Sequence, residues 1–389
     1  MHFVTAQCGE PKNYGMRDTC SICSDNRNNV YIKMIQQRNI FIDSLKGIAI
    51  ILMVAGHSGC PELLHDYIYL FHMPLFFFIS GYLFRTDYIN RPKQFIWRRI
   101  KSCYIPFVKY GVLFLLAHEL LVPLGFTQHY SIHDYIEKLL YILAFTGTES
   151  YLGPFWFLIY MFFASVLFIV LTICVSSVLR HFNQPGKMRN IAIISGGVIL
   201  LSTSVIMMLD VFNVHIPKLT IGTMMAVNYL ALGSIWRRME LHVNLHIAFT
   251  LLLLLFAIVY FTNVQSITAV DGGMLVNSFP HATIYTALSL IGILGVWGLM
   301  RTAQSFKISA FVSVLGRKSM GIMTFHFLAQ ALFLNTIKII GVSNIPSFCW
   351  PIPENMWWFL LTIGSILISL VLMRTEELTC FAISKIKNK

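Results

Sequence analysis

The 389-residue chain is poor in charge, because Lys, Arg, Asp and Glu together make up only 12% of it. Soluble domains carry about 25% charged residues. Hydrophobic residues account for 56% of the chain and aromatic residues for 14%, and the mean hydropathy is +0.68. This composition excludes a soluble enzyme, a disordered chain and a fibrous repeat, since none of them could hide or tolerate so much apolar surface. It indicates an integral membrane protein with many spans.

Acidic residues are the scarcest charged group, with 17 Asp and Glu against 29 Lys and Arg, which gives a net charge of +12. They are too few and too scattered to predict the paired carboxylates of a glycosidase or a proton pump. The basic residues fall in short clusters between apolar runs and form no stripe interleaved with aromatic residues. We therefore expect no nucleic-acid partner.

Cysteine is also sparse, with eight residues in the chain. The close pair Cys20 and Cys23 lacks the second pair or the histidines that a structural zinc site needs, so we expect no metal site. Cys60 and Cys349 both fall in loops predicted to lie outside, and the sequence leaves a disulfide between them open. The first 38 residues contain no apolar core of a signal peptide, so the first span is expected to act as the targeting element, and Met34 is an alternative start.

What the sequence does have is long apolar runs. A bilayer core of about 30 Å needs roughly 20 apolar residues in a helix. The runs lack the period-2 alternation of a membrane barrel, so they predict helices. We predict an all-α polytopic fold with about ten transmembrane helices, at approximately 40–57, 66–84, 103–124, 155–179, 189–210, 218–236, 246–264, 283–301, 319–337 and 356–374.

The distribution of cations predicts the topology. With both termini cytoplasmic, 24 of the 29 Lys and Arg residues fall in cytoplasmic segments, and only Lys138, Lys218 and Lys338 fall in outer loops. This bias is typical of membrane proteins. We expect three parts, which are a polar cytoplasmic segment at 1–38, one membrane domain at 39–374 and a basic cytoplasmic tail at 375–389.

Ionisable residues inside a span are candidates for function. Lys46 and His57 lie eleven residues apart in the first span, so a helix places them on one stripe, about 16 Å apart along its axis. Asp43 lies one turn before Lys46 and can pair with it. The alternative is structural, with Lys46 reaching to the cytoplasmic interface and His57 capping the helix end.

The second span adds further polar groups. It runs inward, which predicts that His72 lies at a depth close to that of His57. Ser80 and Gly81 fall at its inner end, level with Lys46, where a missing side chain lets another helix or a ligand approach closely.

Three later positions are open to two interpretations each. The cluster Arg98, Arg99 and Lys101 either signals topology and binds anionic lipid or binds phosphate. Trp156 opens the fourth span at the outer face, as an interfacial anchor or as part of a site. His326 is expected near the middle of the ninth span, as a packing residue or as the wall of a polar tunnel.

Together these groups could form a transmembrane relay. A neutral imidazole at the outer end can act as a general base toward a hydroxyl or as a nucleophile that accepts an acyl group. Cations at the inner end suit the phosphates of a nucleotide-bearing donor. An acyl thioester made in the cytoplasm could bind there and extend its long arm toward His57.

The motifs that carry these residues, in this order, resemble those of the membrane-integral acyltransferase family 3, and the second resembles the form seen in its fucose 4-O-acetylase branch. The resemblance covers about residues 39–374 and is most specific in the first 110 residues. The motifs are Asp43-Ser-Leu-Lys46 with His57, Phe71–Phe84, Arg98-Arg99-Ile-Lys101 with Pro106, Trp156-Phe-Leu158, and Leu315–Ser319 with His326.

The resemblance implies an O-acyltransferase of the bacterial inner membrane. It would move an acetyl or other short acyl group from cytoplasmic acyl-CoA, with acetyl-CoA as donor and no bound cofactor, to a hydroxyl of a surface glycan or lipid-linked sugar. His57 would be the essential histidine, and Arg98, Arg99 and Lys101 would lie near the CoA phosphates. Lys46 stands where many members have Arg, which replaces bidentate recognition by a point charge. No soluble domain follows the tenth span, so we expect the membrane domain to act alone or to pass its acyl group to a partner.

Two other functions fit parts of the sequence. Ten spans with buried histidines also fit a transporter of a glycan or an organic ion, although paired broken helices in corresponding halves and an internal repeat are missing. A non-catalytic scaffold would tolerate replacement of every intramembrane histidine.

Overall fold

The computed structural model describes residues 39–181, 191–214, 220–239, 242–268, 278–304, 306–341, 348–349 and 351–387, with side chains to residue 379. The chain divides into two units, Met1–Asn39 and Ile40–Lys389. Of the first unit only Asn39 is described, so the predictions for segment 1–38, including Cys20, Cys23 and Met34, lie outside the described residues. All other described residues belong to the second unit.

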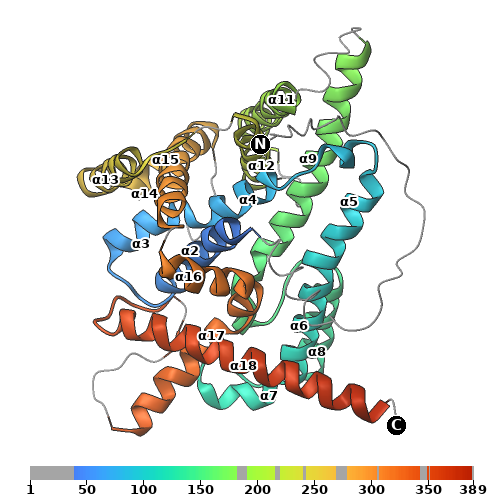
Figure 1. Cartoon of the computed structure of the whole chain (residues 1–389). Helices are drawn as coiled ribbons and strands as arrows, with labels where there is room; N and C mark the ends of the chain where they lie inside the picture. Colours follow the sequence, from blue (N-terminus) through green and yellow to red (C-terminus); the bar gives the residue numbers. More distant parts are fainter. Residues whose placement is uncertain are drawn as a thin grey trace, which may run out of the picture. The chain divides into compact units, whose positions relative to one another are not determined.

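The described residues of this unit form helices and no strands, which confirms the all-α prediction (Figure 1). The elements are α2 (Ile40–Gly56), α3 (Glu62–Tyr69), α4 (His72–Tyr82), η1 (Thr86–Ile89), α5 (Pro92–Arg99), η2 (Ile100–Tyr104), α6 (Ile105–Leu116), α7 (His118–Leu121), η3 (Val122–Leu124), α8 (Ile132–Leu143), η4 (Ser150–Phe155), α9 (Trp156–His181), α11 (Ile191–Val211), α12 (Ile221–Met239), α13 (Leu245–Phe261), α14 (Val264–Thr268), α15 (Phe279–Ala303), α16 (Lys307–Arg317), α17 (Ser319–Ile339) and α18 (Trp358–Lys387).

Six stretches of helix are long and apolar enough to cross a membrane. The segment Pro92–Leu116 with His118–Leu124, bent by 69°, makes a seventh if it is one span. Helix is present in all ten predicted segments, but α2 and α13, with 17 residues each, are shorter than these six. The structure therefore supports a multi-pass membrane protein, while the number ten and the cytoplasmic termini stay predictions. The six stretches are Glu62–Tyr82, Ser150–His181, Ile191–Val211, Phe279–Ala303, Ser319–Ile339 and Trp358–Thr379.

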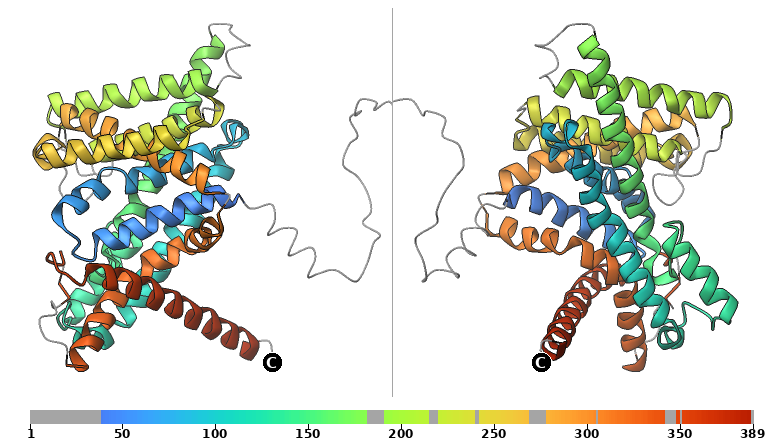
Figure 2. Two further views of the ribbon diagram at one scale, coloured as in Figure 1. Left: turned by 60° about the vertical axis from the view of Figure 1, so that its left-hand side comes forward. Right: turned by 90° about the vertical axis from the view of Figure 1, so that its right-hand side faces the viewer.

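Helix α2 lies at the centre of the packing, with α16 and α4 against it and α15, α17 and α18 also in contact (Figures 1 and 2). Two glycines explain the close approach of α16. A Cβ atom on Gly47 would lie 2.1 Å from the backbone oxygen of Val312, and one on Gly316 would lie 1.7 Å from that of Asp43. The small residues let the two backbones touch. This contact fixes how α2 is rotated about its axis, and therefore where Lys46 points.

The second predicted span is broken into α3 and α4 at Leu70 and Phe71, so His72 is the first residue of α4. Pro74 lies in the first turn of α4, where its missing N–H leaves no helical hydrogen bond unmade. The other end of α4 packs on α12, because a Cβ atom on Gly81 would lie 1.9 Å from the backbone oxygen of Leu230. Helix α9 in turn packs on α12 and on η2 (Figure 2).

The segment between α6 and α9 contains a buried His–Glu pair. His118 Nδ1 lies 3.1 Å from Glu149 Oε2, and the two side chains are 1% and 2% exposed. His118 Nε2 donates to the backbone oxygen of Gln128 at 2.9 Å, and the Tyr130 ring stacks on the imidazole at 3.5 Å between centroids. This pair joins the start of α7 to the residue that precedes η4.

Candidate active site

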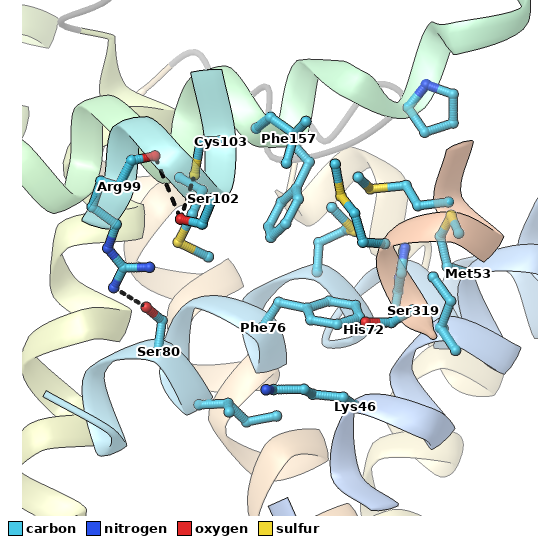
Figure 3. Close-up of a pocket in the computed structure, with 18 of the residues that line it drawn as sticks. Lys46, Met53, His72, Phe76, Ser80, Arg99, Ser102, Cys103, Phe157 and Ser319 are labelled. Carbon is cyan, nitrogen blue, oxygen red and sulfur yellow. Dashed lines mark hydrogen bonds between the residues drawn. The ribbon is translucent and has the colours of Figure 1, made fainter. Parts of the chain in front are cut away.

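A cavity of about 440 Å³ connects most of the predicted site residues (Figure 3). Its walls come from α2, α3, α4, η1, α5, η2, η4, α9 and α17, and from residues that follow α2 and α4. Most of the lining is apolar. Seven residues predicted from the sequence line it, namely Lys46, His57, His72, Ser80, Arg98, Arg99 and Trp156.

His57 follows the last residue of α2 and is 7% exposed. Its backbone N–H donates to the carbonyl oxygens of Met53 and Val54, which holds the residue on the end of the helix. Its Nδ1 lies 2.9 Å from Nε2 of His326 on α17. The preceding Gly56 leaves room for the Tyr69 ring, since a Cβ atom there would lie 2.7 Å from that ring.

Hydrogen bonds from two polar side chains hold the chain around His57. The side-chain amide of Gln330, one turn after His326 on α17, donates to the backbone oxygen of His57 at 3.1 Å and to Ser58 Oγ at 3.2 Å. Asn355 donates from its side chain to the backbone oxygen of Ser58 at 3.2 Å, and from its backbone to that of Gly59 at 3.0 Å. These contacts hold the backbone that carries the imidazole.

His72 lies beside the same end of the cavity. Its Nδ1 donates to the backbone oxygen of Ile68 at 2.9 Å, and the side chain is 2% exposed. Tyr69 neighbours both imidazoles, with its ring centroid 6.2 Å from that of His57 and 4.9 Å from that of His72. His57 and His72 therefore share a neighbour and line one cavity, while their similar depth in the membrane stays a prediction.

The other end of the cavity carries the cations. Arg99 Nη2 donates to Ser80 Oγ at 2.5 Å, and its guanidinium lies over the Phe95 ring at 5.0 Å from the centroid (Figure 3). Arg98 lies over the Tyr88 ring at 5.6 Å. Lys46 on α2 is a third cation in the lining of the cavity. Such a group favours an anionic ligand, and the aromatic rings restrict where the guanidinium groups can move.

Four predicted site residues do not line the cavity. Asp43 is 6% exposed on α2, one turn before Lys46. Gly81 packs on α12, and its role in binding substrate stays a prediction. Lys101 extends over the Trp97 ring at 5.3 Å, and His326 lies behind His57 rather than in the cavity wall.

Sequence reasoning missed several lining residues. Tyr69 lies three residues before His72, and that spacing could have predicted that Tyr69 lies near His72 in the site. Five methionines contribute flexible, polarizable surface to the wall, and nothing in the sequence separates them from ordinary core residues. They are Met53, Met73, Met161, Met320 and Met323.

Cys60 lies between α2 and α3, and Cys349 precedes α18. Cys60 is a buried free thiol and Cys349 an exposed one, so the disulfide that the sequence left open is not formed. Burial raises the pKa of the Cys60 thiol to about 11.

His133, Asp134 and Glu137 on α8 come close enough to share an ion. However, Asp134 already accepts from the backbone N–H of Ser131 at 2.8 Å and completes the capping box of α8.

Comparison with known proteins gives one match. A family model described as an acyltransferase domain, that of acyltransferase family 3, matches residues 39–374. Neither a curated protein nor a solved structure matches the chain.

Proposed function

Because the chain belongs to acyltransferase family 3 and is therefore an acyltransferase, we propose that it moves an acetyl or other short acyl group from cytoplasmic acyl-CoA to a hydroxyl of a surface glycan or a lipid-linked sugar. Membership in a family of enzymes also favours catalysis over the transport and scaffold alternatives. The assignment to the fucose 4-O-acetylase-like branch is supported by the second motif, Phe71–Phe84.

One observation carries the proposal. One cavity is lined by Lys46, Arg98 and Arg99 and by His57 and His72. Lys46 lies near the start of α2 and Arg99 bonds Ser80 near the end of α4, whereas His57 follows the end of α2 and His72 begins α4. A CoA thioester has the matching polarity, with phosphates on one end of a long arm and the acyl carbon on the other. The apolar wall between the two ends suits that arm, because it offers few groups that would compete for the thioester.

In this reaction the cations hold the phosphates and the arm extends toward His57. A ring nitrogen of His57 removes the proton from the acceptor hydroxyl, and the oxygen attacks the thioester carbonyl carbon. The carbon–sulfur bond then breaks. The sulfur leaves as a thiolate and takes the proton back from the imidazolium, so the products are the O-acyl ester and free CoA.

The experiment compares surface glycans by mass spectrometry in cells that produce the wild-type chain, His57→Ala or no protein. We expect O-acetyl groups with the wild type only. The matched control is His246→Ala, which removes an exposed histidine of α13. Full glycan acetylation by His57→Ala, at equal protein level, would overturn the proposed role of His57. If the surface glycans of cells with the wild-type chain and of cells without the protein carry the same O-acyl groups, a surface glycan is not the acceptor.

A further inference from the structure

His326 is 0% exposed on α17 and does not line the cavity, yet its ring contacts the ring of His57. The two imidazoles lie edge to edge, with centroids 5.2 Å apart and an interplanar angle of 17°. Phe327 packs edge-on against His57 with centroids 5.3 Å apart. A residue in this position cannot bind a ligand in the cavity directly, so any effect on the reaction must pass through His57.

The hydrogen bonds of His326 determine which of its nitrogens carries the proton. Its Nδ1 lies 2.9 Å from the backbone oxygen of Met323 and 3.2 Å from that of Ile322. Carbonyl oxygens only accept hydrogen bonds, so Nδ1 must be the protonated nitrogen. In a neutral imidazole the lone pair is then on Nε2.

The same reasoning applies one step further, to His57. Its Nδ1 lies 2.9 Å from Nε2 of His326, which in the neutral ring can only accept. His57 Nδ1 must therefore donate, which leaves the lone pair of His57 on Nε2. A general base or a nucleophile needs such a lone pair on the nitrogen that faces the reactants.

We propose that His326 is a positioning residue that holds His57 in the Nδ1–H tautomer and so keeps its Nε2 basic. This inference rests on the proposed acyl transfer, in which His57 removes the proton of the acceptor hydroxyl. When His57 Nε2 takes that proton, the Nδ1–H···Nε2 bond to His326 is retained and becomes charge-assisted, which stabilises the imidazolium. The proton returns from Nε2 to the departing thiolate, and His326 exchanges no proton.

The other groups near His57 make contacts of other kinds. Tyr69 lies against His57 at 6.2 Å between centroids, and His65 stacks on Tyr69. His72 Nδ1 donates to the Ile68 carbonyl oxygen. The Gln330 amide donates to the backbone of His57 and not to its ring.

The test reads the tautomer directly. Full-length chain labelled with ¹⁵N-histidine is placed in lipid nanodiscs, and solid-state NMR assigns the His57 ring by the signals that His57→Ala loses. Wild type, His326→Gln and His326→Ala are compared, with Thr324→Val as matched control because it removes another buried polar group of α17. The second readout is O-acetylation of surface glycans by mass spectrometry at equal protein level.

We expect the Nδ1–H tautomer in the wild type, in Thr324→Val and in His326→Gln, whose amide oxygen can accept from Nδ1. In His326→Ala we expect loss of that tautomer and a fall in acylation of about tenfold or more, within the range of general-base effects. An Nε2–H tautomer in the wild type, or an unchanged tautomer in His326→Ala, would overturn the inference.

The outcomes also separate this inference from the proposed function. If the tautomers behave as expected but wild-type cells show no O-acylation, the glycan acceptor fails and the positioning role stands. If His57→Ala abolishes acylation while His326→Ala changes neither the tautomer nor the acylation level, the positioning role fails alone.

Discussion

His57 Nδ1 and His326 Nε2 lie 2.9 Å apart, although 269 positions separate the two residues in the chain. The contact joins the end of α2 to the middle of α17. Gln330 strengthens the same junction one turn further along α17, where it donates to the backbone oxygen of His57. The candidate base is therefore held by a helix that contributes few reactive side chains to the cavity.

The hydrogen bond between Arg99 and Ser80 gives the first prediction. Replacing Arg99 by Gln removes a guanidinium held at the cavity wall by Ser80 and Phe95. Hydrogen bonds to charged groups contribute about 1.5–3 kcal/mol, so we expect the KM for acetyl-CoA to rise about tenfold or more with a smaller effect on kcat. The measurement is acetyl-CoA consumption by purified protein in nanodiscs.

The control for Arg99→Gln is Lys93→Gln, which removes an exposed cation from the same helix, α5. It should leave the KM unchanged. If both variants behave like the wild type, these cations signal topology or bind anionic lipid, as their position in a basic cluster also allows.

The glycines of the helix crossings give the second prediction. A Cβ atom on Gly81 would lie 1.9 Å from the backbone oxygen of Leu230, whereas one on Gly196 of α11 would meet nothing within 4 Å. We expect Gly81→Ala to lower the melting temperature or the yield of folded protein. Gly196→Ala should be neutral or stabilising by up to about 1 kcal/mol, because Ala is the better helix former. Thermal unfolding of both purified variants measures this.

An unchanged melting temperature in Gly81→Ala, together with weaker acetyl-CoA binding, would instead return Gly81 to the ligand-binding role that the sequence first indicated.

The stripe that joins Lys46 to His57 was predictable because helical periodicity fixes which residues share a face. Both residues line one cavity. The same argument could not decide about Gly81, since a small residue at a span end admits either a ligand or a helix. In the structure Gly81 packs on α12.

The partner of His57 was out of reach of the sequence for a related reason. Periodicity orders residues within one helix but says nothing of how α2 and α17 face each other, so His326 remained either packing or tunnel wall. Helix was predicted correctly in each apolar segment. The number of spans was harder, because α2 and α13 are 17 residues long and fall near the limit for crossing a bilayer.

Two cysteines give the third prediction. Cys60 is buried with a pKa raised to about 11, and Cys349 is exposed. The thiolate is the reactive form, and below its raised pKa Cys60 remains a thiol. We expect a soluble maleimide at pH 7.5 to label Cys349 and to leave Cys60 unmodified until the protein is denatured, as peptide mass spectrometry can show. Equal labelling of both residues in the folded protein would contradict the buried position of Cys60.

The last prediction compares two His–Glu pairs that differ in burial. The pair His118–Glu149 is 1% and 2% exposed, whereas His129–Glu119 is 80% and 47% exposed. Removing one partner of a buried pair leaves the other without its hydrogen bond in a dry environment, which costs about 3–5 kcal/mol. We expect Glu149→Leu to lower the melting temperature strongly, and Glu119→Leu to have little effect because water replaces the lost contact.

A third variant separates the loss of the pair from the loss of packing. Glu149→Gln keeps an oxygen that can accept from His118 Nδ1, so it should lie between the wild type and Glu149→Leu in melting temperature. Because Glu149 directly precedes η4, whose Pro154 lines the cavity, Glu149→Leu should also reduce acetyl-CoA consumption below the melting temperature. Equal melting temperatures for Glu149→Leu and Glu119→Leu would mean that the buried pair does not stabilise this segment, and η4 would then be held by its apolar contacts alone.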